Sequence, residues 1–427
     1  GLGIIFAVII MMIGFHDNKQ SMSDTEIIEK AKTLGMVEAK NISGTVADEY
    51  NSEKTLKKVK YLCTNRKYLT FFWKIFHYNY PTGKVRYRKQ REIRNNVRRV
   101  KNLEKLKQNP IVKKLGLNRI LLACILVLMF VVFKVVLGSK FPVGDSIKST
   151  LNYVYFLGFL SLGVTFVIAT GGIDFSIGPV MFCCALISGY CMTSYHVPCA
   201  AAMVICILIG FAFGVFNGWM VSYMSVPPFI ISMASMNIAK GIASVFTKTQ
   251  SVSWPLGSDP VNGWFRNLIS YKGFPVGLVI FLAAAVICGI ILYNTKPGRY
   301  ILCLGSNSEA VRLSGVNTKK WRMLAYVICG VLVGIGAIFF VGAYTTVQPG
   351  YGDQYNNEAI AGCVMGGTSM VGGLASIGGT VIGVFIISLL QQGIMAFGLG
   401  KGQQMIITGL IVIVAVYVDV SARRRKN

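Results

Sequence analysis

From residue 117 onward the chain is a succession of long apolar runs, and this pattern constrains the fold more than any other feature. A helix needs about 20 apolar residues to cross a bilayer core about 30 Å thick. Only 14% of the 427 residues are charged, against about a quarter in an ordinary soluble domain. We therefore expect an all-α polytopic membrane protein with about ten transmembrane helices, some of them re-entrant or broken. The ten runs are 117–138, 150–170, 178–194, 197–223, 227–247, 274–294, 321–345, 356–373, 377–398 and 403–420.

Positive charge predicts how these runs are oriented. The net charge is +26, and the segment 57–114 alone carries 19 Lys and Arg against 2 acids. The loop 295–320 and the tail 421–427 are also basic, whereas the loop 248–273 has few cations. An even number of spans puts all three basic segments in the cytoplasm, as the positive-inside rule requires. A basic segment is also typical of nucleic-acid binding; beside so many membrane runs, we expect membrane lipids as its partner and no nucleic acid.

Composition divides the chain into four parts. Residues 1–15 are apolar but short for a span, and we interpret them as a possible membrane anchor helix. Residues 16–116 are predicted to form a basic cytoplasmic extension. Residues 117–420 form the transmembrane domain, and residues 421–427 form a basic cytoplasmic tail.

An aspartate inside an apolar region raises the first functional question. Asp174 lies in "ATGGIDFSIGPV" (169–180), where Gly171 and Gly172 break the helical pattern. A charge in such surroundings must be paired or capped. We expect Asp174, or Ser176 in competition with it, to cap the helix that follows. A direct part in a substrate path or gate is the alternative.

A faint internal repeat bears on this choice. The stretch "GGIDFSIGPVMFCCALIS" (171–188) resembles "GGLASIGGTVIGVFIIS" (372–388) with one gap. Repeats that frame a central pathway are common in transporters, so both glycine pairs, including Gly372 and Gly373, are candidate hinges. Ala375 stands near the place of the aspartate in the second copy. The acid is therefore not required by the turn itself.

Further polar residues inside apolar runs are candidates for a substrate path. Such side chains mark a path or hold helices together by hydrogen bonds, and the pattern alone leaves both readings open. The candidates are Asn217, Ser235, Asn237, Glu358 and Thr368.

The basic loop carries a second motif, "GSNSEAVRLSGVNTKK" (305–320). Ser306 and Glu309 have the spacing of a capping box, and Gly315 is placed to end the helix. We expect a capped helix of about two turns over 305–316. It is either a well-ordered loop helix or a docking helix for a cytoplasmic partner.

Residues that would carry catalysis are missing from the sequence. No Gly-Lys pair is followed by Ser or Thr, so the chain has no P-loop. The three histidines are scattered, and most of the 11 cysteines lie in apolar runs without zinc-ligand spacing. We expect a transport subunit rather than an enzyme, with no metal site and no cofactor of its own. If ATP drives transport, a separate subunit binds ATP-Mg and hydrolyses it.

Four stretches together carry a family resemblance. They are "VTFVIATGGIDFSIGPV", "VPPFIISMASMNIAKGIA", "PGRYILCLGSNSEAVRLSGVNTKK" and "EAIAGCVMGGTSMVGGLASIGGTVIGVFI". In order and spacing they resemble the membrane permeases of bacterial ABC sugar importers of the ribose/xylose/galactose type, which share a fold with branched-chain amino-acid permeases. The resemblance covers 117–420, whereas 1–116 depart from the pattern.

The resemblance implies a multi-pass protein of the bacterial plasma membrane. It implies a permease homodimer, with cytoplasmic ABC ATPase subunits inside and an extracytoplasmic sugar-binding protein outside. It also implies that 305–316 is the coupling helix, with Glu309, Arg312 and Gly315 in its core. An ion-coupled secondary transporter, a membrane-tethered regulator, and a permease for an amino acid, nucleoside or autoinducer remain the alternatives.

Overall fold

The computed structural model describes residues 117–400, 402–410 and 413, and these residues are almost entirely helical. Two short strands, β1 (Val252–Ser253) and β2 (Thr346–Val347), pair antiparallel with Val252 opposite Val347. The α-helices are α7 (Leu117–Leu137), α8 (Val143–Ala169), α9 (Ile177–Ser194), α10 (Cys199–Ser222), α11 (Pro228–Phe246), α12 (Val276–Asn294), α13 (Lys296–Leu313), α14 (Thr318–Ala343), α15 (Asp353–Met365) and α16 (Ile377–Ala396). Two short 3₁₀ helices are η2 (Gly138–Lys140) and η3 (Gly263–Leu268).

Eight helices of the described residues are long and apolar enough to cross a membrane, which confirms the polytopic all-α class. They are α7 to α12, α14 and α16. The prediction of a span at 356–373 is wrong, because α15 has 13 residues and rises only about 20 Å. The run 403–420 is helical over 402–410, and the rest of it lies outside the described residues. The segment 1–116, with its predicted anchor helix, also lies outside them.

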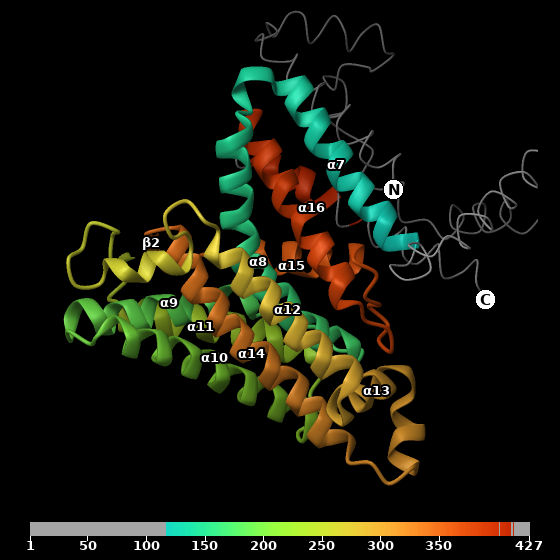
Figure 1. Ribbon diagram of the computed structural model, residues 1–427. Coiled ribbons are helices and arrows are strands. Elements are labelled where there is room, and N and C mark those ends of the chain that lie inside the picture. The colour runs from blue at the N-terminus through green and yellow to red at the C-terminus, as the bar shows by residue number, and fades with distance from the viewer. Residues whose placement is uncertain (1–116, 401, 411–412, 414–427) are drawn as a thin grey trace, which may run out of the picture. The chain divides into compact units, whose positions relative to one another are not determined.

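Helix α8 forms the centre of the domain. In its most apolar stretch 89% of the residues are buried, against 28% in α10, α11 and α12. Helices α12, α14, α15 and α16 pack around α8, and α10 lies along α14 (Figure 1). The outer helices keep large apolar side chains exposed, such as Val204 and Val286. Such faces suit lipid contact or a second protein chain.

Two helices of the core begin after an irregular segment rather than a tight turn. The segment 170–176 separates α8 from α9, and 366–376 separates α15 from α16. Ser176 and Ser376 occupy the same place, immediately before the helix that follows. The repeat seen in the sequence is therefore present in the backbone. Irregular backbone at membrane depth is tolerated where protein surrounds it.

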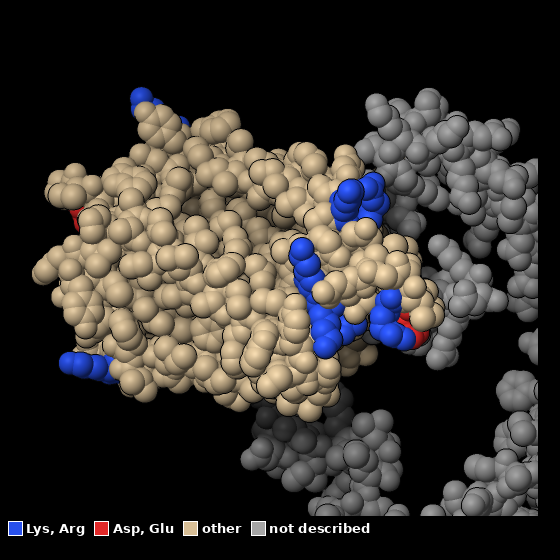
Figure 2. Space-filling view, turned by 90° about the horizontal axis from the view of Figure 1, so that it is seen from below, with Lys and Arg blue, Asp and Glu red and all other residues tan. Residues whose placement is uncertain are grey.

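The described charges are concentrated at one end of the domain. Figure 2 shows Lys and Arg side chains gathered toward the end where α13 lies, and a face that is otherwise nearly free of charge. The segment 295–322 contains a single acid, Glu309, and six cations: Lys296, Arg299, Arg312, Lys319, Lys320 and Arg322. The positive-inside rule predicts that this end is the cytoplasmic one.

Candidate functional site

Four of the predicted polar residues form one buried chain of hydrogen bonds. Ser235 on α11 donates through Oγ to Oδ1 of Asn217 on α10. Asn217 Nδ2 donates to Ser176 Oγ at 3.0 Å, and Ser176 Oγ donates to Asp174 Oδ1 at 2.6 Å. All four side chains are buried. Every donor thus points toward the carboxylate, which is the arrangement that stabilises a buried negative charge.

The expected capping roles of Asp174 and Ser176 are wrong in their detail. Asp174 Oδ1 accepts the backbone N–H of Ser176 at 2.8 Å, one residue before the first turn of α9. Ser176 makes no side-chain cap of its own. The first-turn N–H of Gly178 donates instead to Asn356 Oδ1 of α15 at 2.7 Å. Asn356 Nδ2 also donates to Phe175 O at 2.6 Å, so α15 holds the start of α9 at two points.

A small cavity lies beside the carboxylate. Its volume is about 10 Å³, which is near the lower limit for one water molecule. It is lined by Asp174, Ser176, Ile177, Val180, Phe213, Gly214, Asn217, Cys329, Gly330 and Val333. The polar chain and α14 therefore enclose a space too small for a sugar. The conformation described here is closed around Asp174.

The depth of this cavity separates it from the membrane surface. Gly330 lines it and lies 12 residues after Thr318, the first residue of α14, or about 18 Å along the helix. The positive-inside rule predicts that the basic end of α14 faces the cytoplasm. We therefore expect Asp174 to lie within the hydrocarbon core, which is about 30 Å thick, rather than at its surface.

Glu358 belongs to a second cluster, on the other side of α15. Its Oε2 accepts the Tyr153 hydroxyl at 2.5 Å, and its Oε1 accepts Gln391 Nε2 at 2.7 Å. Gln391 Nε2 also donates to Thr408 Oγ1 at 3.0 Å. Because Tyr153 is on α8 and Gln391 on α16, Glu358 joins three helices. The structure does not bring it into the polar chain of Asp174.

The two remaining path candidates are also placed elsewhere. Thr368 is buried in the segment after α15, where its Oγ1 accepts the backbone N–H of Ser376 at 3.2 Å. Asn237 is exposed on α11, two residues after Ser235. Neither side chain contributes to the cavity beside Asp174.

The helix predicted at 305–316 forms as part of α13, with its bend at a different residue from the expected one. The backbone of α13 leaves helical geometry at Asn307, with φ −159° and ψ 96°. Asn307 Oδ1 accepts Ala310 N–H at 3.0 Å, whereas Ser306 Oγ donates back to Leu302 O at 3.3 Å. The predicted capping box of Ser306 and Glu309 is therefore wrong, and Asn307 caps the second limb. Gly315, with φ +82°, ends it as expected.

Glu309 instead pairs along the exposed face of this second limb. Arg312 donates to both carboxylate oxygens, at 3.0 Å from Nε and 2.5 Å from Nη2. These hydrogen bonds lower the pKa of the Glu309 carboxyl below its usual value. The exposed pair is thus joined by two parallel hydrogen bonds.

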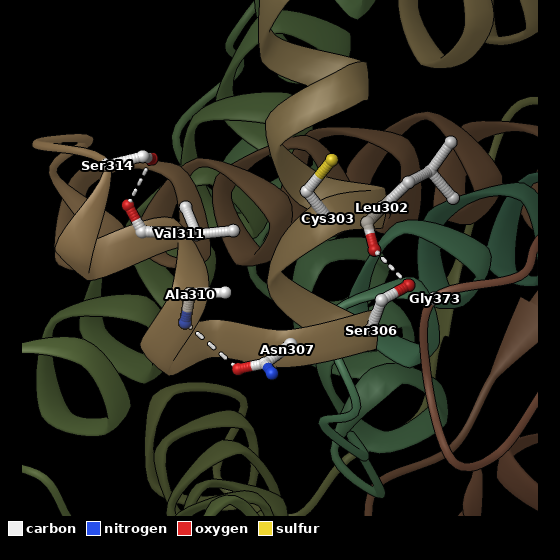
Figure 3. A pocket seen from close by; sticks show the side chains of 8 residues that line it. All are labelled: Leu302, Cys303, Ser306, Asn307, Ala310, Val311, Ser314 and Gly373. Carbon is white, nitrogen blue, oxygen red and sulfur yellow. Dashed lines mark hydrogen bonds between the residues drawn. The ribbon is translucent and has the colours of Figure 1, made fainter.

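A pocket of about 450 Å³ lies between the two limbs of α13. Figure 3 shows Asn307 at the bend, with one limb on each side of the pocket. The lining residues are Leu302, Cys303, Ser306, Asn307, Ala310, Val311, Ser314 and Gly373. Apart from Gly373, the lining belongs to α13 and its C-cap residue Ser314, so through Gly373 the pocket reaches the second glycine loop.

The two predicted glycine hinges meet each other on α13. Gly373 N–H donates to Ala169 O, the last residue of α8, at 3.0 Å. A Cβ on Gly372 would lie 2.7 Å from Gly171 N and 2.9 Å from Gly305 Cα. Gly171, Gly372 and Gly373 have positive φ, which side chains disfavour. The backbones of both repeat loops and of α13 are thus in direct contact; we call this contact the glycine junction.

Two buried residues of the site were not predicted. Asn356 precedes Glu358 by two positions in an apolar run, which is a signal that the sequence offered. Tyr326 on α14 is buried, and its hydroxyl lies against Gly172. No sequence pattern predicts that Asn356 contacts Gly178 or that Tyr326 contacts Gly172, because tertiary packing sets both contacts.

Comparison with known proteins gives a consistent set of relatives. Residues 146–416 match the family model described as branched-chain amino acid transport system / permease component. The ribose import permease protein RbsC of Escherichia coli (strain K12) is 32% identical over 269 residues, 61% of this chain and 81% of that protein.

The names of two further relatives describe the import of other compounds. The fructose import permease protein FrcC of Rhizobium meliloti is 28% identical over 299 residues, 69% of this chain and 83% of that protein. The autoinducer 2 import system permease protein LsrD of Photorhabdus luminescens is 28% identical over 301 residues, 69% of this chain and 89% of that protein. No solved structure matches the chain.

Proposed function

The chain belongs to the branched-chain amino acid transport system permease family, and from that membership we propose that it is the membrane permease of an ATP-driven monosaccharide importer. As a permease subunit it forms the passage through the membrane. Separate cytoplasmic subunits bind ATP-Mg and hydrolyse it, and an extracytoplasmic binding protein delivers the sugar. The bacterial relatives of 28–32% identity support a location in the bacterial plasma membrane.

The observation that carries this proposal is the glycine junction. It joins α13, which faces the cytoplasm, to both loops of the repeat. One of these loops, 170–176, leads directly to Asp174 and the polar chain. A push on the second limb of α13 is therefore transmitted by backbone contact to the segment that carries the buried carboxylate. Packed backbones transmit displacement because they cannot be compressed.

We assign docking of the ATPase to the second limb of α13. Asn307 caps this limb, and the Glu309–Arg312 pair stiffens it. A short rigid limb transfers displacement better than a flexible loop does. The pocket between the limbs offers the partner both apolar and hydroxyl-bearing walls. The apolar outer faces of α10, α11 and α12 provide surface for lipid and for a second copy of the chain in a homodimer.

The chemistry of the polar chain favours a cargo rich in hydroxyl groups. A carboxylate accepts, an amide donates and accepts, and serine hydroxyls do both. Asp174, Asn217 and Ser176 line the same cavity and supply these three kinds of group. Ribose and fructose relatives point to monosaccharides, and the autoinducer 2 relative keeps another small polar cargo as the alternative.

Reconstitution tests the proposal. The full chain is purified with the ATPase subunit that accompanies it, placed in liposomes with the matching binding protein, and assayed with labelled D-ribose and D-fructose. We expect uptake that requires ATP and continues in the presence of an uncoupler. Uptake that needs no ATP and collapses with the proton or sodium gradient would establish an ion-coupled transporter instead.

A further inference from the structure

Tyr326 has a hydroxyl group whose position is unexplained by packing. Its side chain is 1% exposed, and no hydrogen-bond partner for the hydroxyl is found among the described residues. Buried tyrosine hydroxyls are normally paired, because an unpaired one loses its bonds to water without replacement. A phenylalanine would fill the same space without this cost.

The hydroxyl lies at the entrance of the segment that leads to Asp174. A Cβ on Gly172 would lie 2.7 Å from the Tyr326 oxygen, so the hydroxyl touches the backbone of the first glycine loop. Asp174 follows two residues further on in the same segment. On the other side, the Tyr326 Cβ packs against Gly218 of α10.

Tyr326 lies one helical turn before two residues that line the cavity beside Asp174. Cys329 and Gly330 line that cavity and follow Tyr326 by three and four residues on α14, so all three share a helix face. Side chains of a helix point toward its N-terminus, which in α14 is the cytoplasmic end. The Tyr326 ring therefore lies between the cavity and the cytoplasm.

We propose that Tyr326 is a substrate contact at the cytoplasmic exit of the cavity, where its hydroxyl bonds to a hydroxyl of the departing sugar. The hydroxyl is held against Gly172 in the closed conformation and gains its partner when the segment 170–176 moves away. Gly172 follows Gly171, which belongs to the glycine junction, so movement of α13 reaches this contact. The proposal rests on the proposed function and identifies where its cargo leaves.

The substitution Tyr326→Phe tests this role because it keeps the ring and removes only the oxygen. Tyr155→Phe is the matched control: Tyr155 is buried on α8 against Phe339, away from the cavity. Maximal uptake of labelled D-ribose and D-fructose is measured in ATP-loaded liposomes, together with ATP hydrolysis and the melting temperature of each purified protein.

We expect Tyr326→Phe to lower maximal uptake by about 2- to 13-fold, the effect of losing one hydrogen bond, with an unchanged or higher melting temperature. Tyr155→Phe should match wild type. A deoxy sugar that lacks the hydroxyl bonded by Tyr326 should be imported at similar rates by wild type and Tyr326→Phe, because the hydrogen bond is absent in both.

Three results would overturn the inference, and they are distinguishable. Equal uptake by wild type and Tyr326→Phe would leave Tyr326 as a space-filling residue. A loss of uptake in Tyr326→Phe that accompanies a lower melting temperature would assign Tyr326 a purely structural role. Wild-type protein that carries none of the sugars with ATP would refute the proposed function, and this inference with it.

Discussion

Replacing Gly305 by alanine should disconnect α13 from the two repeat loops. A Cβ at this position would lie under 3.0 Å from two backbone atoms, Ala169 O and Gly373 N. Backbone atoms cannot rotate aside as a side chain does, so the contact itself must open. Overpacking of this kind costs about 1–3 kcal/mol. If the junction is formed in the closed conformation only, that cost shifts the equilibrium between conformations by about 5- to 150-fold.

The matched control is Gly289→Ala on α12. Gly289 is also helical, but no atom lies within 4 Å of its ideal Cβ. Alanine there should stabilise the helix by about 0.5–1 kcal/mol, and transport should not change. Both variants are reconstituted with the ATPase and the binding protein, and the ATP hydrolysed for each sugar imported is measured.

We expect Gly305→Ala to keep ATP hydrolysis while sugar uptake falls at least about 5-fold. Gly289→Ala should keep the wild-type ratio of ATP hydrolysed to sugar imported. If Gly305→Ala transports sugar with the same ratio as Gly289→Ala, the backbone contact does not transmit force, and the coupling argument is refuted.

Three further substitutions test the site. Asn356→Ala leaves the Gly178 N–H without its acceptor and should lower the free energy of unfolding by about 1–3 kcal/mol, measured by thermal unfolding in detergent. Asp174→Asn keeps an acceptor oxygen but removes the charge, so we expect the fold to persist and ATP-dependent uptake to fall. Because Arg312 lowers the pKa of Glu309, the ion pair persists until the pH falls below the usual glutamate value of about 4.3. Binding of the ATPase subunit should therefore be equal at pH 7 and pH 5. The substitution Glu309→Gln should weaken this binding at both pH values.

Exposed residues supply the controls for two of these variants. Asn357→Ala alters the adjacent, exposed amide of α15 and should leave the melting temperature unchanged. Asp145→Asn removes an exposed acid in the first turn of α8 and should leave uptake unchanged. If Asp174→Asn imports sugar at the wild-type rate, the charge has no role in gating. If Asn357→Ala lowers the melting temperature as much as Asn356→Ala does, the cap by Asn356 is ruled out.

Hydropathy and charge in the sequence were sufficient for the class of fold, because a bilayer imposes a length and a sidedness on each helix. The span predicted at 356–373 failed because its apolar run conceals the end of α15 and the start of an irregular segment. Polar residues in apolar runs named seven candidates for a substrate path, and four of them, Asp174, Ser176, Asn217 and Ser235, are buried together in the structure. Their order as a hydrogen-bonded chain required the packing of α9, α10 and α11.

Local motifs were less reliable where several residues competed for one backbone group. Ser306 and Asn307 are adjacent and both can cap a helix, and the choice depends on where the bend falls. The first turn of α9 is capped from Asn356, 178 residues away from Gly178. A cap supplied by a distant helix leaves no periodic or local signal in a single sequence.

The difference between the two repeat loops explains why the acid occurs in only one of them. Ser376 caps its own helix by accepting the N–H of Gly379 at 3.1 Å, and the Tyr293 hydroxyl of α12 bonds the backbone on both sides of it. Ser176 is bonded to Asp174 and Asn217 instead, and its helix depends on Asn356 for the cap. The polar groups of the first loop therefore find their partners on α10 and α15, and any separation of these helices exposes them. Side chains that lose these partners when helices move apart are free to bond substrate hydroxyls, and we therefore expect the polar chemistry of the pathway in the first repeat.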